Sequence, residues 1–300
     1  MPTKIEWAEE TWNPVTGCTP VSAGCDNCYA RRMAIRLRGR CGYSADDPFK
    51  VTLHPDRLEQ PLRWWKPRRV FVCSMGDLFH GDVPEEFIDE IFAIMALCPQ
   101  HTFIVLTKRP ERIRGYMQPP PPFYTTRLGP VMEHMEEHGY LSRDDAIAIA
   151  PPGSILPEDP PWPLPNVWLG VTAENQEAAD ERIPILLEIP AAVRFVSVEP
   201  MLGPVALDAF CAPSDGYAQR IKVLIDGIDW VICGGESGPS ARPMHPDWAR
   251  SLRDQCQSAG VPFFFKQWGE WYPDRKGVYD ARCAIFGDTV THKIGKKAAG

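Results

Sequence analysis

Long apolar runs are absent from this sequence of 300 residues, and none approaches the roughly 18 residues that a membrane-spanning helix needs. The first residues, MPTKIEWAEE, also lack the apolar stretch of a secretory signal peptide. We therefore expect no membrane partner and a location in the cytoplasm. Because the cytosol is reducing, we expect the ten cysteines to be ligands, nucleophiles or core residues before disulfides.

Several catalytic motifs are absent as well. The chain has no HExxH zinc motif, no GxxxxGK[ST] phosphate loop and no Ser-His-Asp order, which argues against the commonest hydrolases and nucleotide-hydrolysing enzymes. Basic residues are not in excess either, since 32 Lys and Arg face 39 Asp and Glu and the net charge is −7. This charge argues against a protein that coats nucleic acid without specificity, but it is compatible with a local basic patch.

Proline, in contrast, is abundant, and many of the 32 prolines fall between Gly115 and Pro165 in the runs PPPPF, APPG and PEDPPWPLP. Proline lacks the N–H group and clashes with the preceding helical turn, so such runs form neither helix interiors nor central strands. We predict a Pro-rich insertion over 115–165 in a single domain that spans 1–300.

Short apolar runs recur outside this insertion, and each ends in a polar or glycine cluster. They predict buried strands at 70–73, 102–106, 167–171, 194–198, 230–233 and 262–265. Helical patterns between them predict helices at 85–97, 176–188 and 246–259. Apolar strands that alternate with helices indicate a parallel sheet covered by helices. We therefore predict an α/β fold, a full or partial (β/α) barrel of parallel strands, with a doubly wound open sheet as the alternative.

Ionisable residues follow six of these strands, namely Asp77, Lys108, Glu174, Glu199, Glu236 and Lys266. In a (β/α) barrel the active site is built at the C-terminal ends of the strands, so we expect these residues to line it. We assign catalytic roles to Lys108, Glu199 and Lys266. Two alternatives stay open: polar residues simply resume where strands end, or the four carboxylates hold a divalent metal for hydrolysis.

Three cysteines, Cys18, Cys25 and Cys28, precede the first of these strands in the spacing C-x6-C-x2-C. The flanking glycines, Gly17 and Gly24, allow the loop to fold tightly around one metal centre. A structural zinc site needs four protein ligands, whereas three thiolates leave a position open for chemistry.

Two rival interpretations of the cysteine loop remain. Cys41 could complete a four-cysteine structural zinc site, or Cys25 and Cys28 could form a redox dithiol. Four other cysteines lie in strand or helix patterns and are predicted to be core residues: Cys73, Cys98, Cys233 and Cys256.

The loop WNPVTGCTPVSAGCDNCYA, together with SMGDLF, TKRPERI, VTAEN, SVEPMLG, GGESG, ARPMHPDW and FFFKQWGEW, resembles the phage-associated three-Cys-motif family, a domain of unknown function. That family is similar to the radical S-adenosylmethionine (SAM) superfamily, in which a partial (β/α) barrel carries a [4Fe-4S] cluster on three cysteines. The resemblance implies a [4Fe-4S] cluster on Cys18, Cys25 and Cys28, SAM as a cofactor, and a separately encoded partner protein. The superfamily spacing is commonly C-x3-C-x2-C, from which this chain departs.

The resemblance also implies residues that contact SAM. In the superfamily a glycine-acid turn after the second strand holds the SAM amino group, and the matching turn here is SMGD. The sequence GGE appears after a later strand, where we expect it to face the ribose, the adenine or the substrate. The residues assigned to cofactor binding are Tyr29, Ser74, Met75, Gly76, Asp77, Glu174, Gly234, Gly235 and Glu236.

Two segments combine basic and aromatic residues, which suits phosphate contact and base stacking. The first is YARRMAIRLRGR, whose five arginines are expected around one helix, and the second is RWWKPRR at 63–69. The alternative is a solvated helix face and a Trp pair that packs in the core. Near the C-terminus, Gln267, Trp268 and Trp271 suit a planar polar substrate such as a nucleobase. The alternative is a packed C-terminal plug.

Arg242 precedes the last long helix, where an anion can bind, and we expect His245 to cap that helix. Arg242, Gln267, Trp268 and Trp271 are therefore the predicted substrate residues. The sequence predicts an iron–sulfur enzyme that modifies or repairs a nucleic acid or nucleotide in the cytoplasm, that of a host cell if a phage encodes it. The alternative is a zinc-stabilised, non-catalytic phage protein that binds nucleic acid or a partner.

Overall fold

The computed structural model describes residues 5–117, 162–207, 210–211, 221–222, 224–274, 283–286 and 289–293. The chain divides into two compact units. The first comprises Met1–Thr19, Ala30–Gly170 and Glu188–Val193, and the second comprises Pro20–Tyr29, Val171–Leu187 and Arg194–Gly300. The predicted insertion at 115–165 falls mostly outside the described residues.

Seven parallel strands form the main sheet, in the order β1-β4-β5-β6-β7-β10-β11. They are β1 (Glu10–Trp12), β4 (Arg69–Val72), β5 (Thr102–Thr107), β6 (Val167–Thr172), β7 (Val193–Val198), β10 (Trp230–Gly234) and β11 (Phe263–Gln267). This order follows the chain and has β1 and β11 at its two ends. The predicted α/β fold of parallel strands is confirmed, with the topology of a partial (β/α) barrel.

The first unit packs helices α2 (Glu85–Leu97) and α3 (Pro110–Met117) with β1, β4 and β5. Helix α2 begins with two acidic residues, which favour a helix N-terminus, and most of its side chains are buried. The rings of Phe92 on α2 and Tyr116 on α3 lie 5.2 Å apart, and the Tyr116 hydroxyl donates to Asp89 at 2.6 Å. Aromatic packing therefore joins the two helices.

The first unit also contains nearly all of helix α1 (Tyr29–Arg36), whose first residue ends the segment Pro20–Tyr29 of the second unit. A small antiparallel pair, β2 (Val15–Thr16) and β3 (Thr52–Leu53), belongs to the first unit as well. Trp12, fully buried at the end of β1, packs at 5.8 Å from the ring of Phe103 on β5. These contacts place the segment that leads to Cys18 beside the strand ends of this unit.

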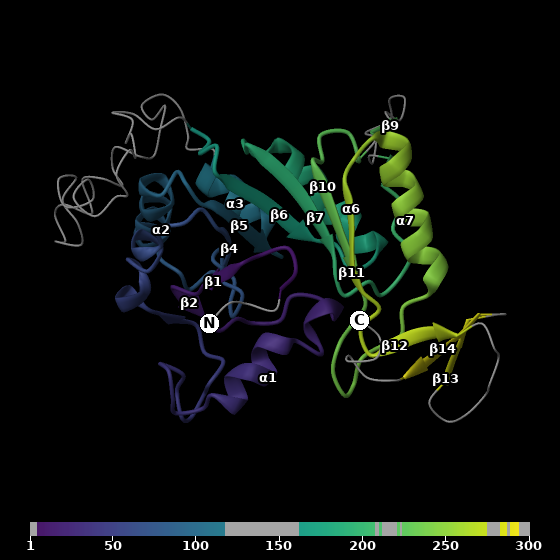
Figure 1. Cartoon of the computed structure of the whole chain (residues 1–300), viewed down its shortest axis with the longest axis horizontal. Coiled ribbons are helices and arrows are strands. Elements are labelled where there is room, and N and C mark those ends of the chain that lie inside the picture. Colours follow the sequence, from purple (N-terminus) through teal and green to yellow (C-terminus); the bar gives the residue numbers. More distant parts are fainter. Residues whose placement is uncertain are drawn as a thin grey trace. The chain divides into compact units, whose positions relative to one another are not determined.

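In the second unit, α7 (Pro246–Ala259) lies along β10 and β11, as Figure 1 shows. Ala249, Leu252 and Cys256 recur at helical spacing and form its buried face. His245 caps the helix by accepting a hydrogen bond from the Asp247 N–H, as the sequence predicts. Gly260 ends it with φ 69°, a left-handed conformation that glycine adopts at low cost.

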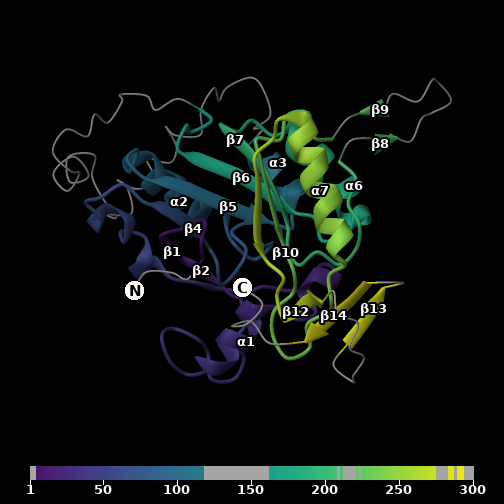
Figure 2. The ribbon, with the colours of Figure 1, turned by 45° about the vertical axis from the view of Figure 1, so that its right-hand side comes forward.

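The remaining elements of the second unit are α6 (Gln176–Glu188), the pair β8 (Phe210–Cys211) and β9 (Ile221–Lys222), and a three-stranded antiparallel sheet, β12-β14-β13. That sheet, which Figure 2 shows below α7, consists of β12 (Trp271–Asp274), β13 (Cys283–Phe286) and β14 (Thr289–Lys293). Among the described residues, no helix combines the length and apolar character needed to cross a membrane.

Of the predicted insertion, Gly115, Tyr116 and Met117 form the last turn of α3, and the bounds of the insertion stay a prediction. Two interpretations of the basic segments need correction. The five arginines do not share one helix, because α1 ends at Arg36. The Trp pair of the second basic segment is not in the core, since Trp65 is 73% exposed.

Candidate functional site

The four cysteines predicted to be core residues are buried free thiols: Cys73, Cys98, Cys233 and Cys256. Burial penalises the thiolate, so it raises the pKa of Cys73 and of Cys98 to about 12. The candidate ligands differ, because Cys18, Cys25 and Cys28 are all partly exposed. The thiolate is the form that binds a metal, and burial disfavours it. The four buried cysteines are therefore poorer candidate ligands than the three partly exposed ones.

Cys18 belongs to the first unit, and its sulfur contacts Arg109. Arg109 lies in the short connection from β5 to α3. Its Nη1 donates to Cys18 Sγ at 3.3 Å. Its Nη2 donates to the carbonyl oxygen of Thr19 at 2.9 Å. The backbone N–H of Cys18 donates to the carbonyl oxygen of Phe49 at 3.2 Å. Backbone and side chain are therefore both fixed at this cysteine.

Asp77 holds Arg109 in place. Its Oδ2 accepts from Arg109 Nη1 at 2.8 Å, and its Oδ1 accepts from the Thr107 hydroxyl at 2.8 Å. The backbone N–H groups of Phe79 and Lys108 donate to the same carboxylate at 3.0 and 3.3 Å. Both carboxylate oxygens are thus engaged within the protein, and Asp77 orients the groups at the end of β5.

The rest of the predicted glycine-acid turn is fastened to the chain before Cys18. The Ser74 hydroxyl and the Met75 N–H both donate to the Asn13 side-chain oxygen, at 3.1 and 2.9 Å. A Cβ on Gly76 would lie only 3.0 Å from the carbonyl oxygen of Gly17, so the two segments meet closely there. Ser74, Met75 and Gly76 therefore form a rigid turn whose role in cofactor binding stays a prediction.

A second cluster lies in the second unit, around Asn27 and Glu236. The Asn27 amide donates to Glu236 Oε2 at 3.0 Å, and Arg242 donates to both oxygens of Glu236, at 2.9 Å from Nε and 2.7 Å from Nη2. Arg242 also contacts Asp26 at 3.1 Å and the carbonyl oxygen of Ala23 at 2.8 Å. The segment with Cys25 and Cys28 is thereby fastened to the residues after β10.

Glu236 and Arg242 stabilise each other's ionised forms. Burial alone would raise the pKa of Glu236, but hydrogen bonds from Arg242 and Asn27 outweigh it and lower that pKa below its ordinary value of 4.5. The hydrogen bond to Glu236 is the main reason that the pKa of Arg242 is raised. The predicted anion site at Arg242 is therefore already filled by a carboxylate of the protein.

Glu174 forms a third contact with the cysteine segment. Its side chain is 1% exposed and pairs at 2.9 Å with Arg182, which is 4% exposed and also donates to the carbonyl oxygen of Thr172. Glu174 Oε1 accepts from the Gly24 N–H at 3.4 Å, and a Cβ on Gly24 would lie 3.0 Å from the Glu174 carboxyl carbon. A side chain at position 24 would therefore press against the Glu174 carboxylate.

Glu199 and Lys266 form an ion pair at the ends of β7 and β11, with Nζ 2.7 and 2.8 Å from the two carboxylate oxygens. About a fifth of each side chain is exposed, which leaves one side open. Gln267 donates to Glu199 Oε1 at 3.5 Å, and a Cβ on Gly234 would lie 3.2 Å from the Glu199 carboxyl carbon. Two residues predicted to be catalytic are thus brought together.

The GGE and KQWG turns interlock through two glycines. A Cβ on Gly235 would lie 1.9 Å from the carbonyl oxygen of Trp268, and one on Gly269 would lie 2.1 Å from that of Glu236. Gly269 also has φ 85°, which side-chain-bearing residues rarely adopt. The ring centroids of Trp268 and Phe265 lie 4.8 Å apart. The indole N–H of Trp271 donates to the carbonyl oxygen of Ala241 at 2.6 Å.

The other predicted residues have simpler surroundings. Lys108 is partly exposed, and its backbone N–H, rather than its ammonium group, contacts Asp77. Tyr29, at the start of α1, is 49% exposed. Cys41 is exposed, and its carbonyl oxygen accepts from Arg57 at 2.8 Å. In the described part of the chain, no three His, Cys, Asp or Glu side chains are grouped closely enough to hold a metal ion.

The two basic segments differ in how their charges are used. In the segment 63–69, Arg63 pairs with Glu59 at 3.1 Å, Arg68 pairs with Glu10, and Arg69 lies 3.6 Å from Glu9. In and after α1, no ion pair involves Arg31, Arg36 or Arg38 among the described residues. The arginines of the second segment are therefore paired with carboxylates, whereas Arg31, Arg36 and Arg38 of the first segment have no ion pair with the described residues.

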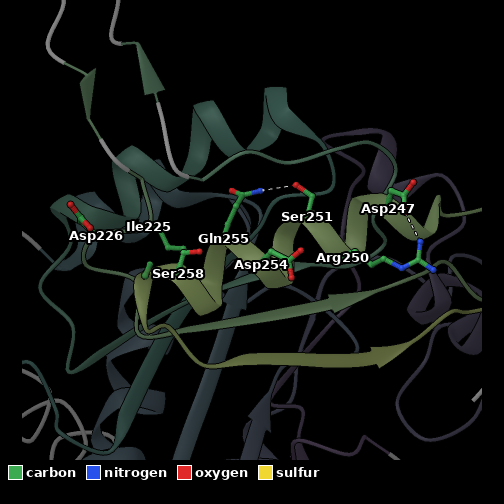
Figure 3. A pocket seen from close by; sticks show the side chains of 9 residues that line it. Ile225, Asp226, Asp247, Arg250, Ser251, Asp254, Gln255 and Ser258 are labelled. Atoms are coloured by element: carbon green, nitrogen blue, oxygen red, sulfur yellow. Dashed lines mark hydrogen bonds and ion pairs between the residues drawn. The ribbon is translucent and has the colours of Figure 1, made fainter.

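An open groove of about 770 Å³ runs along α7 (Figure 3). Figure 3 shows Arg250 paired with Asp247 and the Gln255 amide directed to Ser251. Gln255 also accepts from the Leu207 N–H at 2.6 Å. None of the predicted site residues lines this groove, which is bordered by Ile225, Asp226, Asp247, Arg250, Ser251, Asp254, Gln255, Ser258 and Ala259.

Sequence reasoning missed Arg109, Arg182 and Asn27. Arg109 belongs to the TKRP motif that follows a predicted strand, so its place at a strand end was a usable signal. Arg182 lies inside a predicted helix, and its partner Glu174 is eight residues away. Asn27 meets Glu236 across 209 residues, a contact that no local pattern predicts.

Fold and contacts together define an α/β protein of partial-barrel topology. In the first unit Cys18 contacts Arg109 after β5, and in the second unit the segment with Cys25 and Cys28 contacts Glu236 after β10. The chain belongs to the family described as protein of unknown function (DUF5131), whose model matches residues 2–300. The family resemblance expected from the motifs is thereby confirmed.

Comparison with solved structures finds two similar chains. One is spore photoproduct lyase complexed with dinucleoside spore photoproduct, with a TM-score of 0.42 and 9% identity over 98% of this chain and 70% of that chain. The other is a cysteine-to-serine mutant of spore photoproduct lyase, with a TM-score of 0.41 and 10% identity over 88% of this chain and 78% of that chain. No curated protein matches this sequence.

Proposed function

We propose that this chain is an iron–sulfur enzyme of the radical-SAM type and that Cys18, Cys25 and Cys28 hold a [4Fe-4S] cluster. One observation carries the proposal: an eleven-residue segment presents three partly exposed free thiols and is fastened near both ends to strand-end residues. Thiolates are the usual ligands of such clusters, so the donor set fits. Three of them leave one iron open.

The strand-end residues have distinct roles in this proposal. When bound, the cluster supplies an electron, and its open iron supplies a site for the amino and carboxylate groups of SAM. Asp77 and Glu236 orient the two parts of the cysteine segment. Lys266 and Glu199 present a partly exposed ion pair that can hold a polar group of SAM or substrate. The turns at 74–77 and 234–236 are proposed to contact SAM.

We further propose that the substrate is a nucleic acid or nucleotide. The support is the arginine set of α1 and the following turn, Arg31, Arg36 and Arg38, which directly follows Cys28 and has no ion-pair partner among the described residues. Phosphate contacts need such available cations. A cytoplasmic location and a separately encoded partner protein stay predictions from the sequence.

The cluster is tested by anaerobic purification and reconstitution with iron and sulfide. Iron, sulfide and zinc are measured, and EPR spectra of the dithionite-reduced protein are recorded with and without SAM. We expect a reduced [4Fe-4S] signal that changes when SAM is added. The variant Cys25→Ser should lose the signal, and the matched variant Cys41→Ser should retain it. One tightly held zinc without iron would overturn the proposal.

The substrate class is tested by the salt dependence of oligonucleotide binding. Fluorescence anisotropy of a labelled single strand is measured for the wild type and for the triple variant Arg31→Gln, Arg36→Gln, Arg38→Gln. The slope of log K against log salt concentration is negative, and each lost phosphate contact reduces its magnitude by about 0.7. The triple variant should therefore reduce it by roughly 2. The matched triple variant of Arg63, Arg68 and Arg69 should change it little. Equal effects of the two triples would contradict the role of α1.

A further inference from the structure

Arg109 makes a side-chain contact to the sulfur of a candidate ligand, Cys18. Its Nη1 lies 3.3 Å from Cys18 Sγ and 2.8 Å from Asp77 Oδ2, so a single nitrogen lies between a sulfur and a carboxylate. Its Nη2 donates to the carbonyl oxygen of Thr19 at 2.9 Å and to the Thr19 hydroxyl at 3.1 Å. The planar guanidinium is thus held at both of its ends.

The surroundings of Arg109 fix it further. Its side chain is 15% exposed, and the Thr19 hydroxyl lies 2.8 Å from His80 Nε2. The guanidinium of arginine stays protonated in proteins, so Arg109 places a positive charge between Cys18 and Asp77. Burial lowers the pKa of His80, whose Nδ1 accepts from the Asp82 N–H, so this imidazole is neutral and donates to Thr19 from Nε2.

Cys25 and Cys28 lack such a contact. In the described residues no hydrogen bond to either sulfur is present, and their segment is held through Asn27, Asp26 and backbone groups instead. The surroundings of the three thiols are therefore unequal within the described residues, where a cation contacts the sulfur of Cys18 but not those of Cys25 and Cys28.

We propose that Arg109 is a positioning residue that donates a hydrogen bond to Cys18 Sγ and thereby makes the cluster easier to reduce and slower to lose its iron. This inference rests on the proposed function. A reduced cluster carries one more negative charge than an oxidised one, so a nearby cation and a hydrogen bond to a ligand sulfur favour the reduced form. Groups that orient ligands also affect metal retention, typically by roughly 10- to 100-fold.

The test compares reconstituted wild type with Arg109→Gln, Arg109→Lys and Arg114→Gln. Arg114 is a matched control because it lies on α3, the helix that begins directly after Arg109 in the chain, but pairs at the surface with Glu111 and Glu188. The midpoint potential is measured by EPR-monitored redox titration, and iron loss is measured by its rate of transfer to a chelator. No turnover of substrate is required.

We expect Arg109→Gln to shift the midpoint potential to more negative values and to lose iron at least about 10-fold faster. Arg109→Lys keeps the charge but not the two-ended fork, so its potential should lie near that of the wild type while iron loss is still several-fold faster. Arg114→Gln should match the wild type in both measurements.

The outcomes separate the two proposals. A wild type that binds no iron overturns the proposed function. A wild type with a cluster, together with Arg109→Gln at an unchanged potential and unchanged iron loss, overturns the role of Arg109 alone. If Arg109→Gln does not fold, Arg109→Lys decides, since unchanged iron loss in that variant contradicts the inference.

Discussion

The two parts of the cysteine segment are held in different ways. Cys18, in the first unit, has a cation at its sulfur, and that cation is oriented by Asp77. Cys25 and Cys28, in the second unit, lie in a segment held by its backbone and by Asn27, with Glu236 as the central acceptor. A side-chain contact at the sulfur sets its electrostatics, whereas backbone contacts set only its position.

We call the contacts of Arg109 and Asp77 at Cys18 the first anchor, and the contacts of Glu174 and Glu236 with the segment of Cys25 and Cys28 the second anchor. The two anchors respond differently to the loss of one residue. The first anchor depends on one guanidinium shared between sulfur and carboxylate, so losing it changes charge at a ligand. The second depends on several hydrogen bonds to Glu174 and Glu236, so losing one of them changes the stability of the segment more than its charge. Variants of the two anchors should therefore separate stability from ligand electrostatics.

The largest loss of stability is expected from Arg182→Ala. This change leaves the Glu174 carboxylate, 1% exposed, without its cation, and breaking a buried pair in this way costs about 3–5 kcal/mol. The free energy of unfolding in urea measures the loss. The surface variant Arg250→Ala on α7 is a control and should change it by no more than about 0.5 kcal/mol. A loss below 1 kcal/mol in Arg182→Ala would show that the pair does not hold the second anchor.

The next largest loss is expected from Asp77→Asn in the first anchor. The amide keeps the shape but loses the negative charge opposite Arg109 and one of the two accepting oxygens, and hydrogen bonds to charged groups contribute about 1.5–3 kcal/mol. Urea unfolding of the metal-free protein measures this effect without a cluster. The double variant of Asp77→Asn and Arg109→Gln completes the test. If its loss in free energy of unfolding equals the sum of the losses of the two single variants, the two residues do not act as a pair.

A smaller loss, about 1–2 kcal/mol at pH 7, is expected from Glu236→Gln, because Arg242 is 34% exposed and water screens the pair. The pKa of Glu236 is below its ordinary 4.5, so its contribution is present above pH 4.5 and disappears as the pH falls through the lower folded-state pKa. The difference between wild type and Glu236→Gln should therefore shrink as the pH is lowered below 4.5. Urea unfolding at several pH values measures it, and a constant difference would contradict the assignment.

Much of this arrangement could be predicted from the sequence, because the sheet is parallel and its strands are apolar throughout. Helices 85–97, 176–188 and 246–259 match the structure, and the six predicted strands agree within two residues at either end. The strand β1 was missed because three residues, Glu10–Trp12, are too few to show a period. Helix α3 was missed because it has only eight residues, and the last three of them were included in the predicted Pro-rich insertion.

The candidate site was predictable only in part. Polar residues at strand ends, such as Glu199 and Lys266, do come together, because parallel strands bring their ends to one edge. Which carboxylate pairs with which cation depends on how the side chains extend in the folded protein. For this reason the pairs of Asp77 with Arg109 and of Glu174 with Arg182 were not expected. Local sequence does not contain that information.

The smallest effect is expected from Cys41→Ser, and this variant tests whether the three-cysteine segment needs a fourth protein ligand. Cys41 is an exposed free thiol with a φ of 52°, and the contact it makes to Arg57 comes from its backbone carbonyl, which serine preserves. The free energy of unfolding should change by less than about 0.5 kcal/mol, and the metal content by nothing measurable. A structural zinc site that included Cys41 would instead lose its metal and much of its stability, because zinc binding contributes directly to folding. Metal analysis of Cys41→Ser beside Cys28→Ser therefore distinguishes three ligands with an open position from four ligands in a closed site.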